Sequence, residues 1–222
     1  MPINVFIADD HAVVRDGLRL LLESQNDITV VGDAADGRRT VNQVQQLSPD
    51  ILVMDIAMPE LNGIEATRQI RVVCPSTQVV ILSMYATTEH IFQAMQAGAL
   101  GYLLKESAAV EVVNAIRSVH SGRRYFCKKI DADMIDSYIH YRQISMLKSP
   151  LESLSPRERE VLQLVVEGKS SAEIASILYL SPKTVETYRS RLMQKLSIND
   201  VPGLVKFAIQ HGLTRPACHK PY

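Results

Sequence analysis

Five short apolar runs along residues 3–104 constrain the fold of this chain more than any other feature of its sequence. The runs are Ile3 to Ala8, Ile28 to Gly32, Ile51 to Asp55, Val79 to Met84, and Gly101 to Leu104. The third run begins with four consecutive apolar residues and shows no alternation of apolar with polar positions. Strands of that kind are typical of a parallel sheet whose two faces are both covered by helices.

The segments between these runs carry the spacing of amphipathic helices. Val14, Leu18, Leu21 and Leu22 recur at i, i+4, i+7 and i+8, and charged residues fill the opposite face. Val41, Val44 and Leu47 repeat the pattern after the second run. We therefore expect an α/β doubly wound domain over residues 1–122, built on a five-stranded parallel sheet. Such a domain binds its ligands at the carboxyl ends of the strands.

The rest of the chain shows helical periodicity only. Residues 123–150 carry no strand signal and are rich in charge, which predicts a linker with one short helix within Asp131 to Gln143. From Leu151 onward three helix starts are marked, by Ser155-Pro156-Arg157-Glu158, Ser170-Ser171-Ala172-Glu173 and Ser181-Pro182. A supporting helix followed by two helices on a tight turn predicts an all-α helix-turn-helix domain over residues 151–215. Residues 216–222 are expected to form a flexible tail.

Composition narrows the class of protein. With 46% apolar and 22% charged residues, the chain can bury a core and is not a disordered or fibrous protein. Three cysteines without paired spacing, and no apolar run of spanning length, predict a cytoplasmic protein without disulfides or a membrane segment. The net charge of zero hides an asymmetry, since residues 1–148 sum to −3 and residues 149–222 to +3. This offset weakly favours different partners for the two parts.

Acidic residues end two of the expected strands. Asp9 and Asp10 follow the first and Asp55 ends the third, so three carboxylates converge at one edge of the sheet. Clustered carboxylates repel one another, and a bound hard divalent cation such as Mg²⁺ commonly neutralises this repulsion. Ser83 and Lys105 end two further strands and supply a hydroxyl and a positive charge for a phosphoryl group. Asp55 is our candidate nucleophile. The alternative is that Asp9 and Asp10 only cap the following helix.

These residues carry a resemblance to the receiver domain of two-component response regulators. Besides the acidic pair, the carriers are Asp55-Ile56-Ala57-Met58-Pro59 with Gly63, the strand-ending Ser83, and Tyr102-Leu103-Leu104-Lys105. The resemblance implies that Asp55 accepts a phosphoryl group from a phosphohistidine. It implies that Mg²⁺ is held by Asp10, Asp55 and the backbone carbonyl of Ala57, with Asp9 acting directly or through water. It also implies that Ser83 and Tyr102 form a switch, and that Lys105 pairs with the phosphoryl oxygen. One departure is visible, because Glu106 stands where many receivers have proline.

The third helix of the C-terminal part has two different faces. Val185, Leu192 and Leu196 project to one side, whereas Lys183, Thr187, Ser190, Arg191 and Gln194 project to the other. An ordinary surface helix could show the same division. The preceding short helix, the tight turn and the basic stretch favour a helix that enters the major groove of DNA.

The same segments resemble the LuxR-type helix-turn-helix. The carriers are Leu154 to Leu162, Glu173-Ile174-Ala175, and Ser181-Pro182-Lys183-Thr184-Val185. A receiver domain joined to this module is the architecture of the NarL/FixJ class. The resemblance implies that Lys183, Thr184, Arg191 and Lys195 hold the DNA backbone, and that Glu186, Thr187 and Ser190 face bases. Arg189 projects near the buried side, where its guanidinium either reaches a phosphate or pairs with a glutamate of the domain.

Together these features predict a phosphorylation-gated, DNA-binding transcriptional regulator rather than an enzyme. Its expected partners are a sensor histidine kinase, double-stranded DNA and, when phosphorylated, a second copy of the chain. The first alternative is a phosphotransfer enzyme with an aspartyl-phosphate intermediate, but Ala57 stands where such enzymes commonly place a second acid. The second alternative keeps the receiver and gives the helical unit a protein or RNA partner.

Overall fold

The computed structural model of this chain describes residues 2–107, 109–130, 150–211 and 213–214. The chain divides into two compact units, residues 1–141 and 142–222. The expected linker helix within residues 131–143 and the expected tail at 216–222 lie outside the described residues.

The first unit is built on a parallel sheet. Its strands are β1 (Ile3–Ala8), β2 (Ile28–Ala34), β3 (Ile51–Met54), β4 (Gln78–Ser83), β5 (Gly101–Leu104) and β6 (Tyr125–Phe126). They lie in the order β2-β1-β3-β4-β5-β6, and every neighbouring pair is parallel. β1 and β3 are adjacent, so the residues that follow them emerge side by side at the carboxyl edge. The expected doubly wound parallel sheet is confirmed.

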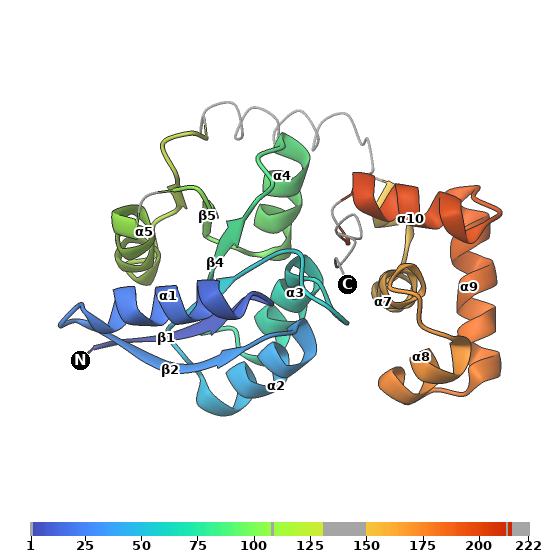
Figure 1. Cartoon of the computed structure of the whole chain (residues 1–222), viewed down its shortest axis with the longest axis horizontal. Helices are drawn as coiled ribbons and strands as arrows, with labels where there is room; N and C mark the ends of the chain where they lie inside the picture. The colour runs from blue at the N-terminus through green and yellow to red at the C-terminus, as the bar shows by residue number, and fades with distance from the viewer. Residues whose placement is uncertain (1, 108, 131–149, 212, 215–222) are drawn as a thin grey trace, which may run out of the picture. The chain divides into compact units, whose positions relative to one another are not determined.

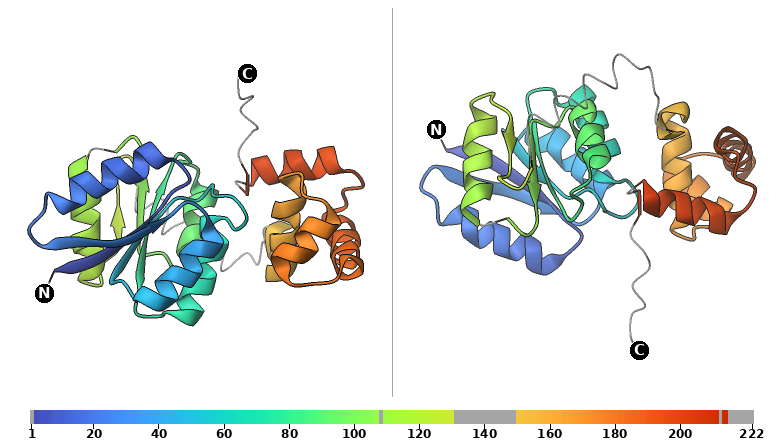
Figure 2. Two further views of the ribbon diagram at one scale, coloured as in Figure 1. Left: turned by 60° about the horizontal axis from the view of Figure 1, so that its bottom comes forward. Right: turned by 90° about the horizontal axis from the view of Figure 1, so that it is seen from above.

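Five helices connect the strands of this unit. They are α1 (Ala12–Glu23), α2 (Gly37–Leu47), α3 (Gly63–Val73), α4 (Thr88–Ala97) and α5 (Ala109–His120). Figure 1 labels these elements, and Figure 2 shows α1 and α5 on one face of the sheet and α2, α3 and α4 on the other. All four residues of β3 are buried, as expected of a strand covered on both faces. Leu47 departs from the pattern, because 49% of its surface is exposed at the end of α2.

The expected number of five strands is wrong, since β6 adds a sixth at the edge of the sheet. Tyr125 and Phe126 pair with Gly101 and Tyr102 of β5, and Cys127 directly after them is fully buried in the same core. The sheet therefore continues beyond residue 122, into the segment in which the sequence predicted no strand. A strand of two residues is too short to show the spacing of apolar residues from which a strand is predicted. Its formation depends on the edge of β5, which is open for pairing.

The second unit consists of helices. A 3₁₀ turn, η1 (Pro150–Ser153), precedes α7 (Pro156–Val166), α8 (Ser171–Leu178), α9 (Pro182–Leu196) and α10 (Val201–Gln210). The Ser155–Glu158 and Ser170–Glu173 capping boxes form as the sequence predicted. Ser181 caps α9, and Pro182 occupies its first turn. A separate core of apolar side chains from all four helices holds this unit together.

None of the helices among the described residues combines the length and the apolar character that a membrane crossing requires.

Candidate functional site

Two buried carboxylates and one lysine meet at the carboxyl edge of the first unit. The side chains of Asp9 and Asp55 are 2% and 1% exposed, and that of Lys105 is 10% exposed. Lys105 Nζ lies 2.5 Å from Asp9 Oδ2 and 2.9 Å from Asp55 Oδ2. The ammonium group thus bridges two carboxylates that come from different strand ends. The sequence predicted that these carboxylates lie close together, but it assigned Lys105 to a phosphoryl oxygen and not to them.

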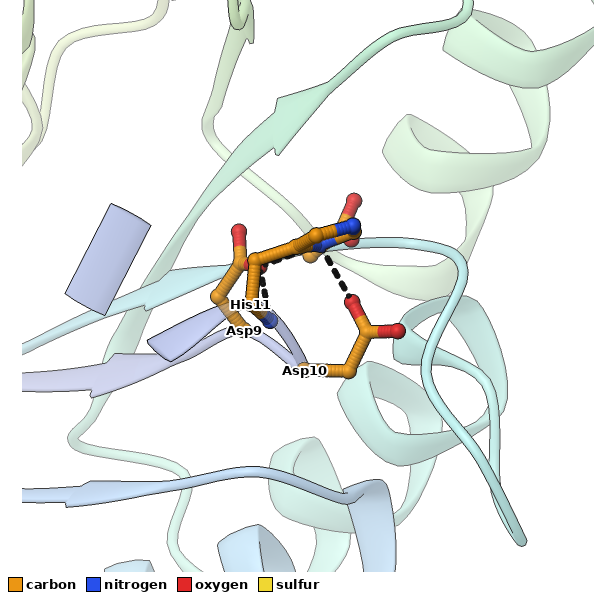
Figure 3. Close-up of side chains that lie close together, drawn as sticks. Asp9, Asp10 and His11 are labelled. Carbon is orange, nitrogen blue, oxygen red and sulfur yellow. Dashed lines mark hydrogen bonds and ion pairs between the residues drawn. The ribbon is translucent and has the colours of Figure 1, made fainter. Parts of the chain in front are cut away.

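Asp10 and His11 form the more exposed side of this site. Asp10 Oδ1 lies 2.8 Å from His11 Nδ1, and Asp9 Oδ1 lies 3.2 Å from the same nitrogen. Figure 3 shows the imidazole ring between the two carboxylates, with dashed lines from His11 to both. His11 is also the N-cap residue of α1, but its side chain makes no capping hydrogen bond. His11 was not among the predicted site residues, and the contact of its ring with both acids is seen only in the structure.

Backbone contacts fix the position of these carboxylates. The amide of Asp55 donates to the carbonyl of Ala8 at 2.8 Å, and the amide of Asp9 donates to the carbonyl of Ala34 at 3.1 Å. Gly63, the first residue of α3, approaches the backbone of Asp55 so closely that a Cβ there would overlap the Asp55 carbonyl. A glycine is therefore required at this position for α3 to pack against the site.

Arg15 supports the site from α1. Its NH1 group donates to the backbone carbonyl of Asp9 at 2.7 Å, and its Nε lies 3.0 Å from a carboxylate oxygen of Asp33. Arg19 binds the other oxygen of Asp33 at 2.5 Å. Arg15 was not predicted as a site residue. Helical spacing indicates only that Arg15 lies on the charged face of α1, and nothing else in the local sequence indicates its contact with Asp9.

The donor set fits a hard divalent cation. Ligand atoms of Asp9, Asp10, His11 and Asp55 all lie within 4.8 Å of one another. Asp9 Oδ2 is buried and accepts no hydrogen bond of ordinary geometry, so its contact among the described residues is the ion pair with Lys105. Three carboxylates are oxygen ligands of the type that Mg²⁺ prefers, whereas an imidazole is not. Ala57 is buried two residues beyond Asp55.

Ser83 and Tyr102 lie next to the acidic cluster on β4 and β5. Ser83 Oγ accepts a hydrogen bond from the amide of Tyr85 at 3.1 Å, and the Tyr102 hydroxyl donates to the carbonyl of Tyr85 at 2.7 Å. Tyr102 is fully buried. Burial raises the pKa of its phenol well above the usual value, a hydrogen bond with Ser83 opposes this rise, and the charge of Asp55 adds to it. The two side chains of the expected switch are therefore linked through Tyr85.

In the second unit, α9 presents the two faces that the sequence predicted. Val185 and Leu192 are buried in the core. Residues of the opposite face are exposed, namely Lys183, Glu186, Thr187, Ser190, Arg191 and Gln194. Thr184 is half-buried because it belongs to the first turn, where its amide binds the hydroxyl of Ser181. The Thr187 hydroxyl donates to the carbonyl of Lys183 at 3.0 Å.

Two basic residues of α9 have partners within the unit. Lys195 Nζ lies 2.7 Å from Glu158 Oε2, and the Glu158 side chain on α7 is 4% exposed. Burial alone would raise the pKa of Glu158, but hydrogen bonds from Lys195 and Ser155 hold it below the usual value. Arg189 NH1 lies 3.0 Å from Ser171 Oγ and 3.8 Å from Glu186 Oε1. Of the two alternatives predicted for Arg189, the structure shows a contact with a glutamate, namely the exposed Glu186 one turn earlier on the same helix.

Comparison with known proteins covers both units. Residues 5–117 match the family model described as response regulator receiver domain, and residues 152–208 match that of bacterial regulatory proteins, luxR family. The chain is 41% identical over 211 residues to the response regulator UvrY of Escherichia coli, covering 95% of each chain. It is 37% identical over 213 residues to the oxygen regulatory protein NreC of Staphylococcus carnosus, covering 95% of this chain and 98% of NreC.

Solved structures agree with these matches. The RcsB response regulator of Salmonella typhimurium is 28% identical and superimposes with a TM-score of 0.63 over 95% of this chain and 98% of RcsB. The response regulator RcsB in its complex with DNA is 26% identical, with a TM-score of 0.55 over 95% of this chain and 99% of the other.

Proposed function

The chain belongs to the two-component response regulators of the NarL/FixJ class, and on that basis we propose how its residues carry out regulation. It is a DNA-binding transcriptional regulator with a receiver domain and a LuxR-type helix-turn-helix. We assign the phosphoacceptor to Asp55. The observation that carries this assignment is the placement of Lys105 between the buried carboxylates of Asp9 and Asp55.

The geometry of the acidic cluster suits phosphoryl transfer to a carboxylate. An oxygen of Asp55 attacks the phosphorus of a phosphohistidine on the sensor kinase, the P–N bond breaks, and its electron pair returns to the imidazole. Lys105, 2.9 Å from Asp55, is placed to pair with an oxygen of the transferred group. A bound Mg²⁺, held by Asp9, Asp10, Asp55 and the carbonyl of Ala57, would neutralise charge on that group. The imidazole of His11 lies 2.8 Å from Asp10 at the exposed side of the cluster.

The proposed acceptor is tested by mass spectrometry after incubation with acetyl phosphate and Mg²⁺. The wild-type chain should gain one phosphoryl group, and Asp55→Asn should gain none. Asp16→Asn is the matched control, because Asp16 is an exposed aspartate on α1 that does not belong to the acidic cluster. An undiminished gain in Asp55→Asn would place the acceptor elsewhere. Ala57 offers no proton for hydrolysis, so we expect no multiple turnover of a small phosphomonoester.

We propose that the added phosphoryl group acts on the rest of the chain through Ser83 and Tyr102. The group brings new acceptor oxygens to the end of β4, and the Ser83 hydroxyl is the nearby donor. A movement of Ser83 changes the segment that also supplies the acceptor of the Tyr102 hydroxyl. The output is a changed receiver surface that favours a homodimer, whose two α9 helices read paired half-sites in the cytoplasm.

For DNA binding we propose that α9 enters the major groove. Lys183, Thr184 and Arg191 contact phosphates, and Thr187, Ser190 and Glu186 face base edges. We expect Lys195 to contribute less to contacts with the DNA backbone, because its ammonium group already neutralises the buried Glu158. Support comes from the exposure of this face and from the DNA complex of the relative RcsB.

The salt dependence of binding tests these assignments. With a duplex selected from a random library, Arg191→Ala should lower the slope of log affinity against log salt by about 1. Lys206→Ala on α10 is the control, and its slope should match that of the wild type. A shallow salt dependence in the wild type, with preferred binding to RNA, would contradict the DNA assignment.

A further inference from the structure

A negatively charged side chain lies on the face of α9 that we assign to DNA. Glu186 is the fifth residue of α9, and 60% of its side chain is exposed. The phosphates on the two sides of the major groove would repel a free carboxylate at this position. Glu186 therefore opposes DNA binding unless its charge is neutralised and its oxygens contact a base.

Two side chains hold the Glu186 carboxylate in the free protein. The hydroxyl of Ser171, the first residue of α8, donates a hydrogen bond to Glu186 Oε1, and Arg189 NH1 donates to the same hydroxyl at 3.0 Å. Arg189 NH1 also lies 3.8 Å from Glu186 Oε1. Because α8 lies next to α9 (Figure 1), these hydrogen bonds join the two helices. The guanidinium neutralises the carboxylate, and the hydroxyl fixes its direction.

These contacts use only one oxygen of the carboxylate. Within the described part of the chain no group binds Glu186 Oε2, which can therefore accept a further hydrogen bond. Cytosine is the base whose edge in the major groove offers an amino donor without an acceptor. Guanine and thymine present acceptors and adenine has N7 beside its amino group, so each of them would repel a carboxylate. An acceptor that is held in place before binding also loses less conformational entropy when the contact forms.

We propose that Glu186 accepts a hydrogen bond from the N4 amino group of one cytosine in each half-site, and that Ser171 and Arg189 are the positioning residues for this contact. The inference rests on the proposed entry of α9 into the major groove, and it deepens that proposal by naming the base. Ser171 and Arg189 act through Glu186 and need not touch DNA themselves. Replacing the cytosine should weaken binding by about 5- to 150-fold, the range for one mismatched base pair.

The test selects duplexes from a random library with the full chain in Mg²⁺ and beryllofluoride, and then measures affinities by fluorescence anisotropy. The wild type should select one position in each half-site at which cytosine is preferred. Glu186→Gln should lose the preference for cytosine at that position and keep the preferences at the others, since a glutamine pairs best with adenine. A Glu186→Gln protein that still prefers cytosine there, and binds every duplex more tightly, would overturn the inference, because Glu186 would then only repel phosphates.

Ser171→Ala tests the positioning role. The preference for cytosine should fall by about 2- to 10-fold, because the carboxylate loses one hydrogen bond. The slope of log affinity against log salt should stay unchanged, because a hydroxyl carries no charge. Ser171→Thr keeps the hydroxyl and should restore the wild-type preference. Ser176→Ala, at an exposed serine of the same helix, is the control and should change nothing.

The double variant connects the two residues. Ser171→Ala added to Glu186→Gln should change the base preference no further, because the hydroxyl then has no carboxylate to orient. An unchanged preference for cytosine in Ser171→Ala would overturn the positioning role. A wild type that selects no duplex at all would overturn the proposed function itself, whereas a wild type that selects a duplex without cytosine at any position sensitive to Glu186→Gln would overturn this inference alone.

Discussion

Gly63→Ala is the sharpest test of how the fold positions the phosphoacceptor. The added Cβ would lie 2.9 Å from Met54 Cγ and from the carbonyl carbon of Asp55, and nearer still to the carbonyl oxygen. Ordinary contact begins at 3.4 Å, so even the two carbon contacts are short by 0.5 Å. Most of the obstacle is backbone, which cannot turn aside like a flexible side chain. Either α3 or the segment carrying Asp55 has to move.

The expected loss of stability lies at the upper end of the range for substitutions that overpack a core. We expect the free energy of unfolding of the receiver domain to fall by about 3 kcal/mol. That loss corresponds to a decrease of about 10 °C in its melting temperature. Displacement of Asp55 should also slow phosphorylation by acetyl phosphate by about 10- to 100-fold, because the nucleophile no longer lies in line with its donors.

Gly17→Ala supplies the matched control. Gly17 lies within α1, and a Cβ there meets nothing within 4 Å. Alanine in an exposed helix interior should raise the free energy of unfolding by about 0.5–1 kcal/mol and leave the phosphorylation rate unchanged. Calorimetry of the full chain measures both variants, since the receiver transition is the one that Mg²⁺ with beryllofluoride raises. A Gly63→Ala protein that melts with the wild type and is phosphorylated at the same rate would refute the reasoning.

Three further predictions concern charges. Lys105→Met leaves two buried carboxylates without their cation, so the free energy of unfolding should fall by about 3 kcal/mol. Mg²⁺ should then raise the free energy of unfolding of this variant more than that of the wild type. Equal effects of Mg²⁺ on both proteins would argue against a shared site. The pKa of Glu158 is lowered in the folded state, so its contribution to stability is complete above about pH 5 and is lost as the pH falls through the folded pKa. Glu158→Gln, which keeps the capping box, should therefore flatten the acid decline of the melting temperature of the helical unit below about pH 5, and an unchanged decline would contradict this. Lys195→Met should lower the melting temperature of the helical unit more than it weakens DNA binding, whereas Lys183→Met should do the reverse, as thermal scans and titrations with the selected duplex would show.

Much of the candidate site could be predicted from the sequence because parallel strands all end at one edge. Asp9, Asp55, Ser83 and Lys105 each lie at or directly after the carboxyl end of a strand. Because the strands are parallel, these four residues must lie at the same edge of the sheet. The starts of the helices in the second unit could be predicted equally well. Each capping box satisfies amides within four residues, so its signal is complete in the local sequence.

Other features were decided only by the tertiary structure. β6 pairs because β5 leaves an edge open, the ring of His11 lies between two acids, and Lys195 reaches Glu158 across 37 positions of the chain. Tyr85 joins Ser83 to Tyr102 through its backbone, which no side-chain pattern records. Periodicity determines which face of a helix or strand is buried, because that depends on the repeat of the element itself. The partner that a polar group meets depends on how two elements cross, and that crossing is fixed only when the core of each unit is packed.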